Sequence, residues 1–295
     1  MPELPEVETI RQDLSVKIVG RKILAVKVLD KKLGTNQGKL ARVLLGNKVI
    51  KADRIGKLLI FELADNNFLL IHLKMTGQLV YVDGDEIIAG GHPFKKGSVL
   101  DKVGGKLPSK HTRLHLKFAP SKTDDEGNLF FNDIRRFGYA KIVSNNELEL
   151  IKNDYGIEPL KKDFTLENLK KRLLNRGVSI KAALLDQKKI SGIGNIYADE
   201  ILFAAGIKPS RPAKSLKSKE LEKIHLEAEK IIAKAIKYRG TTFSDYVDAS
   251  GQKGNFTQFL QVYGRQGEKC FKCEGVVVKS RVAGRGTHFC PKCQS

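Results

Sequence analysis

The N-terminal segment carries residue types that can perform covalent chemistry. The chain begins Met1-Pro2-Glu3-Leu4-Pro5-Glu6, and an initiator Met before a small residue is normally trimmed, so we expect Pro2 to present a free secondary amine. An α-amino group has an ordinary pKa of about 8, and its neutral form can attack a sugar or carbonyl carbon and form a Schiff base. Glu3 and Glu6 are close enough in sequence to move protons for that amine. The alternative is that Pro2 is only the neighbour of the start codon and that the two acids cap the following helix.

All four cysteines lie near the C-terminus, in the pairs Cys270-x2-Cys273 and Cys290-x2-Cys293. This spacing is typical of a tetrahedral structural zinc site. Two disulfides are the alternative, and the lack of export features argues against them. Four thiolates leave no open coordination position, so we expect one structural zinc ion that folds a segment too small for its own core. The turn between the pairs holds Arg285 between two glycines and could present it to a phosphate; a solvated Arg is the alternative.

Two further loops and one lysine contain residue types that suit nucleic-acid binding. Ser191–Asn195 places two glycines before a helix whose first N–H groups could bind a phosphate, with Lys181 nearby, although an ordinary glycine-rich turn fits equally well. Lys57 follows a glycine at the start of a strand, and Asp133–Gly138 is a basic and aromatic turn between two strands. Taken alone, each of these last two fits surface charge and packing better than a site.

The composition indicates a globular protein with a nucleic-acid partner. The 295 residues leave room for two or three domains, and 41% of them are hydrophobic. The formal net charge is +20, of which +7 falls in residues 1–150 and +13 in residues 151–295, as expected of a nucleic-acid binder, although solvated lysine faces are also common. No apolar run approaches the roughly 18 residues of a membrane span, and the acidic start is unlike a secretory signal. We therefore expect a soluble cytoplasmic protein with no membrane partner.

The elements that must position these residues change in type near residue 150. An amphipathic helix is expected at 6–19, and alternating strands then indicate a β-sandwich or barrel. The expected strands are 23–29, 58–63, 67–73, 78–82, 113–118 and 139–143. The expected helices are 165–176, 179–189, 196–205 and 219–239, with Asn195 capping the third. Residues 83–110 lack periodicity and are expected to form a long surface loop, and 241–264 an ordered but mobile one.

Together these motifs resemble the formamidopyrimidine-DNA glycosylase family nearly from end to end. The resemblance rests on the Pro-Glu-Leu-Pro-Glu start, Gly56-Lys57, 72–75 (His-Leu-Lys-Met), 135–138 (Arg-Arg-Phe-Gly), 180–181 (Ile-Lys), 192–197 (Gly-Ile-Gly-Asn-Ile-Tyr), 261–265 (Gln-Val-Tyr-Gly-Arg) and the four-cysteine segment. The start and the cysteine segment are highly specific in combination, because nothing in folding physics couples an N-terminal proline to a C-terminal zinc ribbon.

The resemblance implies a fold and an activity. The fold is α+β and multidomain: an N-terminal β-sandwich with an N-terminal helix at 1–150, a helix–two-turn–helix domain at 151–264 and a zinc finger at 265–295. The activity is that of a bifunctional DNA glycosylase and abasic-site lyase, which excises oxidised purines such as 8-oxoguanine and formamidopyrimidines from duplex DNA. Double-stranded DNA with oxidised bases or abasic sites is the implied partner, zinc the implied metal with no organic cofactor, and the expected state is a monomer.

The resemblance also implies roles for individual residues. Pro2 is the nucleophile at the sugar, Glu3 the general acid and base, and Lys57 a contact at the lesion, while Glu6 supports the pocket. Met75, Arg135 and Phe137 fill the space left by the flipped nucleotide. The implied phosphate contacts are Lys181, Asn195, Tyr263, Arg285 and, after the unusually long 83–110 segment, His111. Residues 244–257 form the loop over the flipped base.

Two other functions remain open at this stage. Endonuclease VIII is a near relative that prefers oxidised pyrimidines, but its start typically has Gly where this chain has Leu4. A non-catalytic zinc-containing DNA-binding protein fits the charge and the cysteines. It gives no reason for Pro2, Glu3 and Lys57 to occur together.

Overall fold

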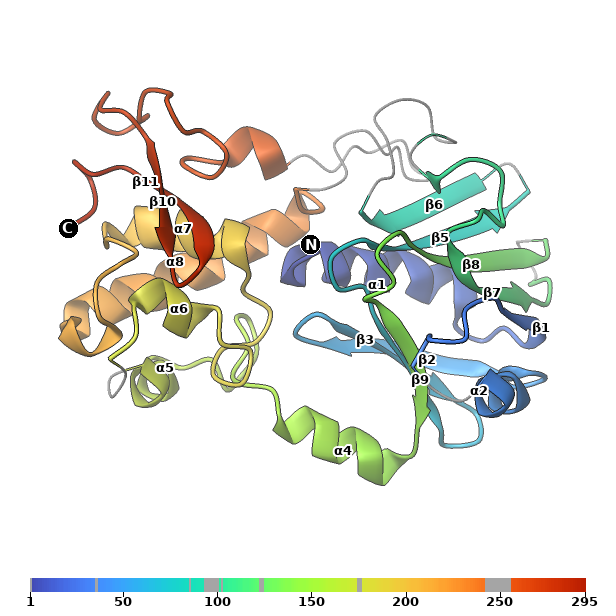
Figure 1. Cartoon of the computed structure of the whole chain (residues 1–295). Helices are drawn as coiled ribbons and strands as arrows, with labels where there is room; N and C mark the ends of the chain where they lie inside the picture. The colour runs from blue at the N-terminus through green and yellow to red at the C-terminus, as the bar shows by residue number, and fades with distance from the viewer. Residues whose placement is uncertain are drawn as a thin grey trace. The chain divides into compact units, whose positions relative to one another are not determined.

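The computed structural model describes residues 2–34, 37–84, 86–92, 101, 103–121, 125–173, 177–241 and 256–295. The chain forms two compact units (Figure 1). Unit 1 comprises Met1–Lys152 and Tyr238–Asn255, and unit 2 comprises Asn153–Lys237 and Phe256–Ser295. The expected three-domain division at residues 150 and 264 stays a prediction. Among the described residues, no helix is both long and apolar enough to span a membrane.

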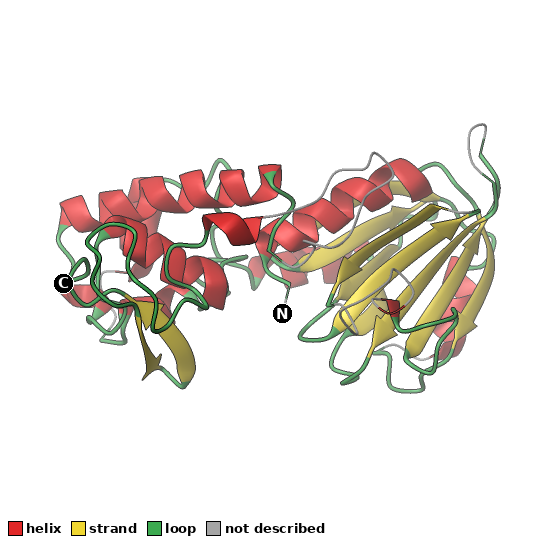
Figure 2. Cartoon of the chain, turned by 90° about the horizontal axis from the view of Figure 1, so that it is seen from above, coloured by secondary structure: helices red, strands yellow, loops and turns green. Residues whose placement is uncertain are grey.

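Unit 1 is built on two antiparallel sheets, whose strands are drawn in yellow in Figure 2. One sheet has the order β1-β7-β8-β5-β6 and the other the order β2-β3-β4-β9. The first contains β1 (Ile23–Val28), β5 (Gly77–Asp83), β6 (Glu86–Gly91), β7 (Thr112–Phe118) and β8 (Gly127–Asp133). The second contains β2 (Val49–Ile55), β3 (Leu58–Leu63), β4 (Phe68–His72) and β9 (Tyr139–Val143). The predicted N-terminal β-sandwich is confirmed.

The core of unit 1 lies between the sheets, where alternate side chains of facing strands meet. Leu114, Leu116 and Phe118 of β7 are buried in the same cluster as Phe61 of β3 and Leu69 of β4. The intervening residues of β7 include His115 and Lys117, which are only partly buried. Alternation in the sequence therefore predicted correctly which face of this strand is buried.

Two helices cover the edges of the sandwich. Helix α1 (Leu4–Ile18) packs against β2 and β3 of one sheet and against β6, an edge strand of the other. Helix α2 (Gln37–Leu44) packs against β1 and β9, the edge strands at the opposite side of each sheet. Each helix thus shields edge strands, which would otherwise be open to pairing with other chains.

The expectation of a surface loop at 83–110 is wrong for its first part. Residues Glu86–Gly91 form β6 and pair with β5. Within the described later part, Val103 is fully buried and belongs to a second small core with Val80 of β5 and Phe130 of β8. Val103 therefore packs on the outer face of the five-stranded sheet.

Unit 2 is mainly helical. Its elements are the end of α4 (Asn145–Asn153), α5 (Leu166–Leu173), α6 (Ile180–Leu184), α7 (Asn195–Ala205), α8 (Ser218–Lys237) and the 3-10 helices η1 (Ala213–Ser215) and η2 (Phe256–Phe259). Helix α6 is shorter than the expected 179–189, because the chain turns after Leu184. The Gln187 side chain braces that turn by donating to the backbone oxygens of Leu185 and Ile193 and accepting from the N–H of Gly192.

The C-terminal part of unit 2 is a hairpin beside the cysteines. Strands β10 (Val278–Val282) and β11 (Arg285–Phe289) pair antiparallel, and Val282 lies opposite Arg285. Phe203 of α7 shares a small buried cluster with Val262, Val277, Cys270 and Cys290. The cysteine segment therefore packs on α7 and does not stand alone.

Candidate functional site

The start of the chain is buried and connected to a distant segment of unit 1. Pro2 is buried, and Glu3 is 3% exposed. The N–H of Glu3 donates to Oε2 of Glu6 at 2.8 Å, as expected of an acid in the first helical turn. The other oxygen of Glu6 accepts from the N–H of Thr241 at 2.8 Å and from its hydroxyl at 3.1 Å. Glu6 therefore links the first turn of α1 to Thr241.

Lys57 lies in the turn between β2 and β3 and is 5% exposed. Arg54 connects this turn to α1, because its Nη1 donates to the backbone oxygen of Gly56 and its Nε donates to Glu8 at 2.7 Å. Burial alone would raise the pKa of Glu8, but hydrogen bonds and charge from Arg11 and Arg54 outweigh it and hold the pKa below its ordinary value. An ionised Glu8 thus keeps the loop before Lys57 against the N-terminal helix.

Met75, Arg135 and Phe137 are all exposed on the surface of unit 1. Met75 is 43% exposed and Phe137 58% exposed, and Nη1 of Arg135 approaches Sδ of Met75 at 3.6 Å. Large apolar side chains that are exposed in the free protein are suited to pack against a binding partner. The three residues come from two loops, one after β4 and one after β8, so something must hold those loops side by side.

A buried carboxylate, Asp133, holds these two loops together. It is 0% exposed, and its Oδ1 accepts hydrogen bonds from the hydroxyl of Thr76 and from the N–H of Arg135, the latter at 3.1 Å. Its Oδ2 accepts the N–H of Gly138 at 2.7 Å. The donors lie beside Met75, on Arg135 itself and beside Phe137. Asp133 is therefore the anchor of all three exposed side chains.

His111 lies immediately before β7 and also contacts this anchor. Its backbone oxygen accepts the N–H of Asp133 at 2.9 Å. Partial burial lowers the pKa of His111, and the charges of Lys110 and Arg113 lower it further. The ring is thus disfavoured as a cation. It can still donate a hydrogen bond from its protonated nitrogen.

His72, at the end of β4, lies between the Lys57 turn and the Met75 loop. It pairs with Leu58 across the sheet, and its Nδ1 accepts the N–H of Lys74 at 2.9 Å. Burial lowers the pKa of His72 to about 3, with the charges of Lys74 and Lys57 adding to the effect. The ring is neutral at physiological pH, as its role as an acceptor requires, and it fixes the conformation of the residue before Met75.

In unit 2, Lys181 is fully buried in an ion pair. Its Nζ lies 2.6 Å from Oδ1 of Asp199, and neither side chain is exposed. The ammonium also donates to the backbone oxygen of Gly286 at 3.0 Å and to the hydroxyl of Thr287 at 2.9 Å. Lys181 thus contacts the residues that follow Arg285, and its role as a phosphate ligand stays a prediction.

The other three unit 2 residues expected at the phosphates lie near the ion pair of Lys181 and Asp199. Asn195 does not cap α7 as expected: Gly194 is the capping residue, and Nδ2 of Asn195 donates to the oxygen of Gly286 at 3.0 Å. The Tyr263 ring meets the ring of His288 edge-on at 4.9 Å. Arg285 is exposed at the start of β11. The structure therefore gathers Lys181, Asn195, Tyr263 and Arg285 along β11.

Glu200 positions the backbone around Tyr263. It is 3% exposed, and its carboxylate accepts the N–H groups of Gln261, Val262 and Tyr263 at 2.8, 2.9 and 2.8 Å. Burial raises the pKa of Glu200 even though these three bonds favour the charged form. Glu200 and its neighbour Asp199 were not identified from the sequence. A signal was available: two adjacent acids in the otherwise apolar helix Asn195–Ala205 indicate buried polar contacts.

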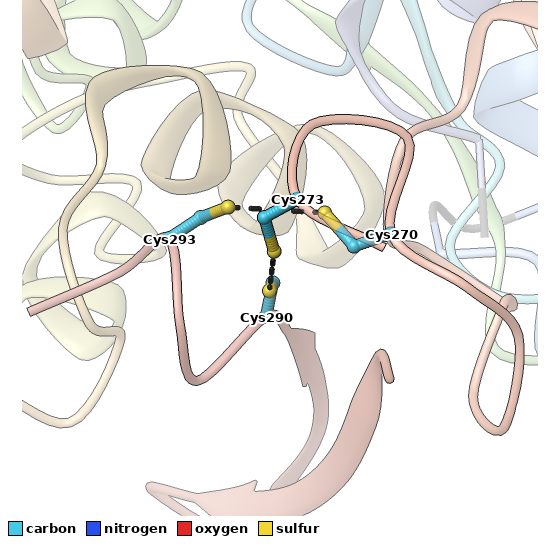
Figure 3. Close-up of side chains that lie close together, drawn as sticks. All are labelled: Cys270, Cys273, Cys290 and Cys293. Atoms are coloured by element: carbon cyan, nitrogen blue, oxygen red, sulfur yellow. Dashed lines mark hydrogen bonds between the residues drawn. The ribbon is translucent and has the colours of Figure 1, made fainter. Parts of the chain in front are cut away.

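The four cysteines form one compact cluster (Figure 3). Their sulfur atoms all lie within 4.8 Å of one another, with Cys270 and Cys293 at 3.8 Å and Cys273 and Cys290 at 3.5 Å. A tetrahedral zinc site with Zn–S bonds of about 2.3 Å has sulfur atoms about 3.8 Å apart. Burial, together with the neighbouring sulfurs, raises the pKa of the Cys293 thiol to about 12. The donor set and spacing fit a metal that stabilises thiolates.

Three family models match successive parts of the chain. Residues 1–140 match the formamidopyrimidine-DNA glycosylase N-terminal domain, and residues 155–247 match the H2TH domain of the same glycosylase. Residues 267–295 match the zinc finger found in FPG and IleRS. The formamidopyrimidine-DNA glycosylase of Carboxydothermus hydrogenoformans is 42% identical over all of both chains. The chain belongs to the formamidopyrimidine-DNA glycosylase family.

Solved structures of the Lactococcus lactis glycosylase have the same fold. The complex of a point mutant of that enzyme with Fapy-dG containing DNA is 34% identical, covers 100% of both chains and has a TM-score of 0.85. Its complex with DNA containing an abasic site is 34% identical, covers 99% of both and has a TM-score of 0.84. Its complex with oxidised pyrimidine DNA is 35% identical, covers 100% of both and has a TM-score of 0.84. The predicted family and fold class are confirmed.

Proposed function

We propose that this protein is a bifunctional glycosylase and abasic-site lyase that excises oxidised purines from duplex DNA. The observation that carries the proposal is the buried start of the chain: Pro2 and Glu3 lie directly before the first turn of α1, and Arg54 connects that helix to the turn of Lys57. Membership of a DNA glycosylase family, and relatives solved with damaged DNA, support the assignment.

In the proposed chemistry, removal of Met1 frees the Pro2 nitrogen. Its lone pair forms a bond to the anomeric carbon of the sugar, while the glycosidic bond breaks and the base leaves with the electron pair of the glycosidic bond and takes up a proton. The nitrogen then loses its N–H proton and its lone pair forms the C=N bond of an iminium, while the bond between the anomeric carbon and the ring oxygen breaks and that oxygen takes the electron pair and a proton. Removal of a proton from the neighbouring carbon then expels the 3′ phosphate, and a second elimination expels the 5′ phosphate. Glu3 moves the protons at the sugar, and Lys57 contacts the lesion and assists proton or phosphate handling.

Residues other than Pro2, Glu3 and Lys57 are proposed to bind the DNA around the lesion. A base inside a duplex cannot be reached by Pro2, so the nucleotide must rotate out of the helix. Met75, Arg135 and Phe137 are proposed to fill the space it leaves, as the exposure of all three and the contact between Met75 and Arg135 suit, and His111 to contact the backbone. Lys181, Asn195, Tyr263 and Arg285 are proposed to act at the phosphates, and one zinc ion to be held by Cys270, Cys273, Cys290 and Cys293. Of the loop proposed at 244–257, residues 244–255 lie outside the described part of the chain.

The decisive experiment is reductive trapping. The purified protein is incubated with an 8-oxoguanine·cytosine duplex and borohydride, beside Pro2→Gly and Lys57→Ala. We expect a covalent protein–DNA adduct that peptide mapping places at residue 2, loss of most of that adduct in Pro2→Gly, and slower formation in Lys57→Ala. Tight binding with no adduct from any lesion would leave a DNA-binding protein without lyase chemistry.

Excision of oxidised pyrimidines is a second candidate. It is favoured by the structure of the L. lactis relative with oxidised pyrimidine DNA. Single-turnover rates on 8-oxoguanine, formamidopyrimidine and oxidised pyrimidine duplexes, all measured with the same enzyme preparation, separate the two. Faster release of the pyrimidine would overturn the purine assignment while leaving the Pro2 chemistry intact.

A further inference from the structure

We propose that Asp199 is a positioning residue for DNA binding, which fixes the hairpin that carries Arg285. This inference rests on the proposed function, because it takes Arg285 as a phosphate contact. Asp199 lies on α7 and is 0% exposed, so it cannot touch DNA itself. Its effect must pass through the groups that it holds.

The carboxylate of Asp199 binds the hairpin on two sides. Its Oδ2 accepts the N–H of His288 at 2.8 Å and lies 3.3 Å from Nδ1 of the same residue. Its Oδ1 pairs with Nζ of Lys181, which in turn donates to Gly286 and Thr287. Asp199 therefore holds β11 directly at one residue and through a buried cation at two others, so every residue from 286 to 288 is fixed.

The hairpin needs such a support because its tip is exposed. Residues 283 and 284 form the turn with φ angles of 49° and 75°, and both are exposed, as is Arg285. A long side chain on an exposed two-residue hairpin has large conformational freedom, which binding would have to remove. Fixing the next three residues of β11 to a helix lowers that entropic cost before DNA arrives.

The same cluster reaches two further proposed phosphate contacts. Asn195, one helical turn before Asp199 on α7, donates to the oxygen of Gly286, and His288 packs against the Tyr263 ring. Lys181 is part of the cluster as the cation that neutralises Asp199. This inference refines the role proposed for Lys181: because its side chain is 0% exposed, Lys181 acts at the phosphates through the turn that it binds and not by direct contact.

For Asp199→Asn, the inference predicts a change in DNA affinity opposite in direction to the change that net charge alone predicts. Asp199→Asn removes a negative charge from a protein that binds a polyanion, so long-range attraction alone would tighten binding. If Asp199 positions Arg285, binding becomes weaker instead. The matched control is Glu167→Gln, which makes the same charge change at an exposed ion pair with Lys171 on α5.

The test is a double-mutant cycle between Asp199→Asn and Arg285→Ala in the full-length zinc-loaded protein. Affinity for a duplex with a tetrahydrofuran abasic analogue is measured by fluorescence anisotropy at salt concentrations from about 50 to about 200 mM. Loss of one charge-assisted phosphate contact is expected to raise Kd about tenfold and to reduce the salt slope by about 0.9. We expect each single variant to show this loss, the double variant to be no weaker than Arg285→Ala, and Glu167→Gln to bind like the parent.

Three results would overturn the inference: unchanged affinity in Asp199→Asn, losses that multiply in the double variant, or an equal loss in the charge control. Because a lone buried ammonium can unfold a protein, Lys181→Met/Asp199→Leu is measured beside it as an uncharged replacement of similar shape. If both versions lose zinc and their cooperative unfolding transition, Asp199 is a folding residue and the inference fails.

A second readout separates this inference from the proposed chemistry. With DNA at saturating concentration, the rate of borohydride trapping in Asp199→Asn should stay within about twofold of the parent, since Asp199 acts on affinity and Pro2 on the chemical step. A slowed trapping rate at saturation contradicts a purely positioning role. If the parent protein binds the duplex but forms no adduct, the proposed lyase activity fails while the binding cycle still decides the role of Asp199.

Discussion

Each unit gathers its candidate DNA contacts around one buried aspartate, but the two aspartates are satisfied in different ways. In unit 1, the Asp133 carboxylate accepts from neutral donors: the Thr76 hydroxyl and the backbone N–H groups of Arg135 and Gly138. In unit 2, the Asp199 carboxylate pairs with the ammonium of Lys181 and accepts from His288. The first carboxylate is held by neutral polar groups, and the second belongs to an ion pair excluded from water.

The difference follows from what each aspartate must join. Asp133 ends β8 and binds its own loop, with only Thr76 coming from another loop of the same sandwich. Asp199 belongs to α7 and holds a hairpin 89 residues away in sequence, on a segment whose own core is small. Strongly directional contacts between charged groups compensate there for the small hydrophobic area. Breaking the two networks should therefore have different consequences, and the metal beside the second should matter most.

The largest expected effect comes from removing metal from unit 2. Chelation, or Cys290→Ser, should unfold the hairpin segment, because structural zinc contributes on the order of 10 kcal/mol to the folding of small metal-bound segments. We expect loss of DNA binding and of one equivalent of zinc, with the β-sandwich signals of unit 1 retained in NMR spectra. Unfolding of both units together would remove the contrast between them. Cys290→Ser that keeps its zinc would show that the metal lies elsewhere.

The next largest effect is expected at Asp133. In Asp133→Asn the amide nitrogen faces the N–H of Gly138, so one buried donor loses its acceptor, and the free energy of unfolding should fall by about 2 kcal/mol. Denaturant unfolding measures this loss. The matched control is Phe137→Ala, on the same loop and 58% exposed, whose unfolding free energy should stay within about 0.5 kcal/mol of the parent. Equal losses in the two variants would refute an anchoring role for Asp133.

A smaller effect is a pH dependence that belongs to unit 1. The folded pKa of His72 is about 3, below the ordinary value of 6.5, so as pH falls below 6.5 the unfolded chain takes up a proton that the folded one does not. Stability is fully present above that pH and declines toward pH 3. Between about pH 7 and about pH 5 the loss should be on the order of 2 kcal/mol. Urea unfolding at both values should show it in the parent. His72→Gln should show a correspondingly smaller loss, and an identical loss in this variant would refute the assignment.

The sequence predicted best those elements that have one buried face and one face exposed to solvent. Strand β7 alternates and was predicted, whereas β8 was missed because both its faces are buried, one by the sandwich core and one by the segment of Val103. Strand β2 was missed because its register shifts between Val49 and Lys51, which breaks the alternation. Helix Gln37–Leu44 is short and basic, and it forms because its buried leucines cover two strand edges.

For the site, sequence motifs identified exposed ends and missed buried anchors. Met75, Phe137 and Arg285 belong to loops whose residue types already suggest contact with a partner. Asp133 and Asp199 gain their roles only from partners that folding brings together, 57 residues away for Thr76 and 89 for His288. Such partners follow from tertiary structure, since no local pattern specifies them. The roles proposed for the exposed residues stay predictions until the experiments above are done.

The contact between Glu6 and residues 240–241 sets how freely this region can vary in sequence. Gly240 has a φ of 78°, and a Cβ there would lie 2.5 Å from Oε1 of Glu6, so geometry and space both exclude a side chain. Gly264 has nearly the same φ of 77° but no atom within 4 Å of its Cβ position, so Asn or Asp could replace it. In a library of variants selected for repair, position 240 should accept only glycine while position 264 drifts. Glu6 should change only together with the segment it binds, and homologues should therefore keep or lose the two as a pair.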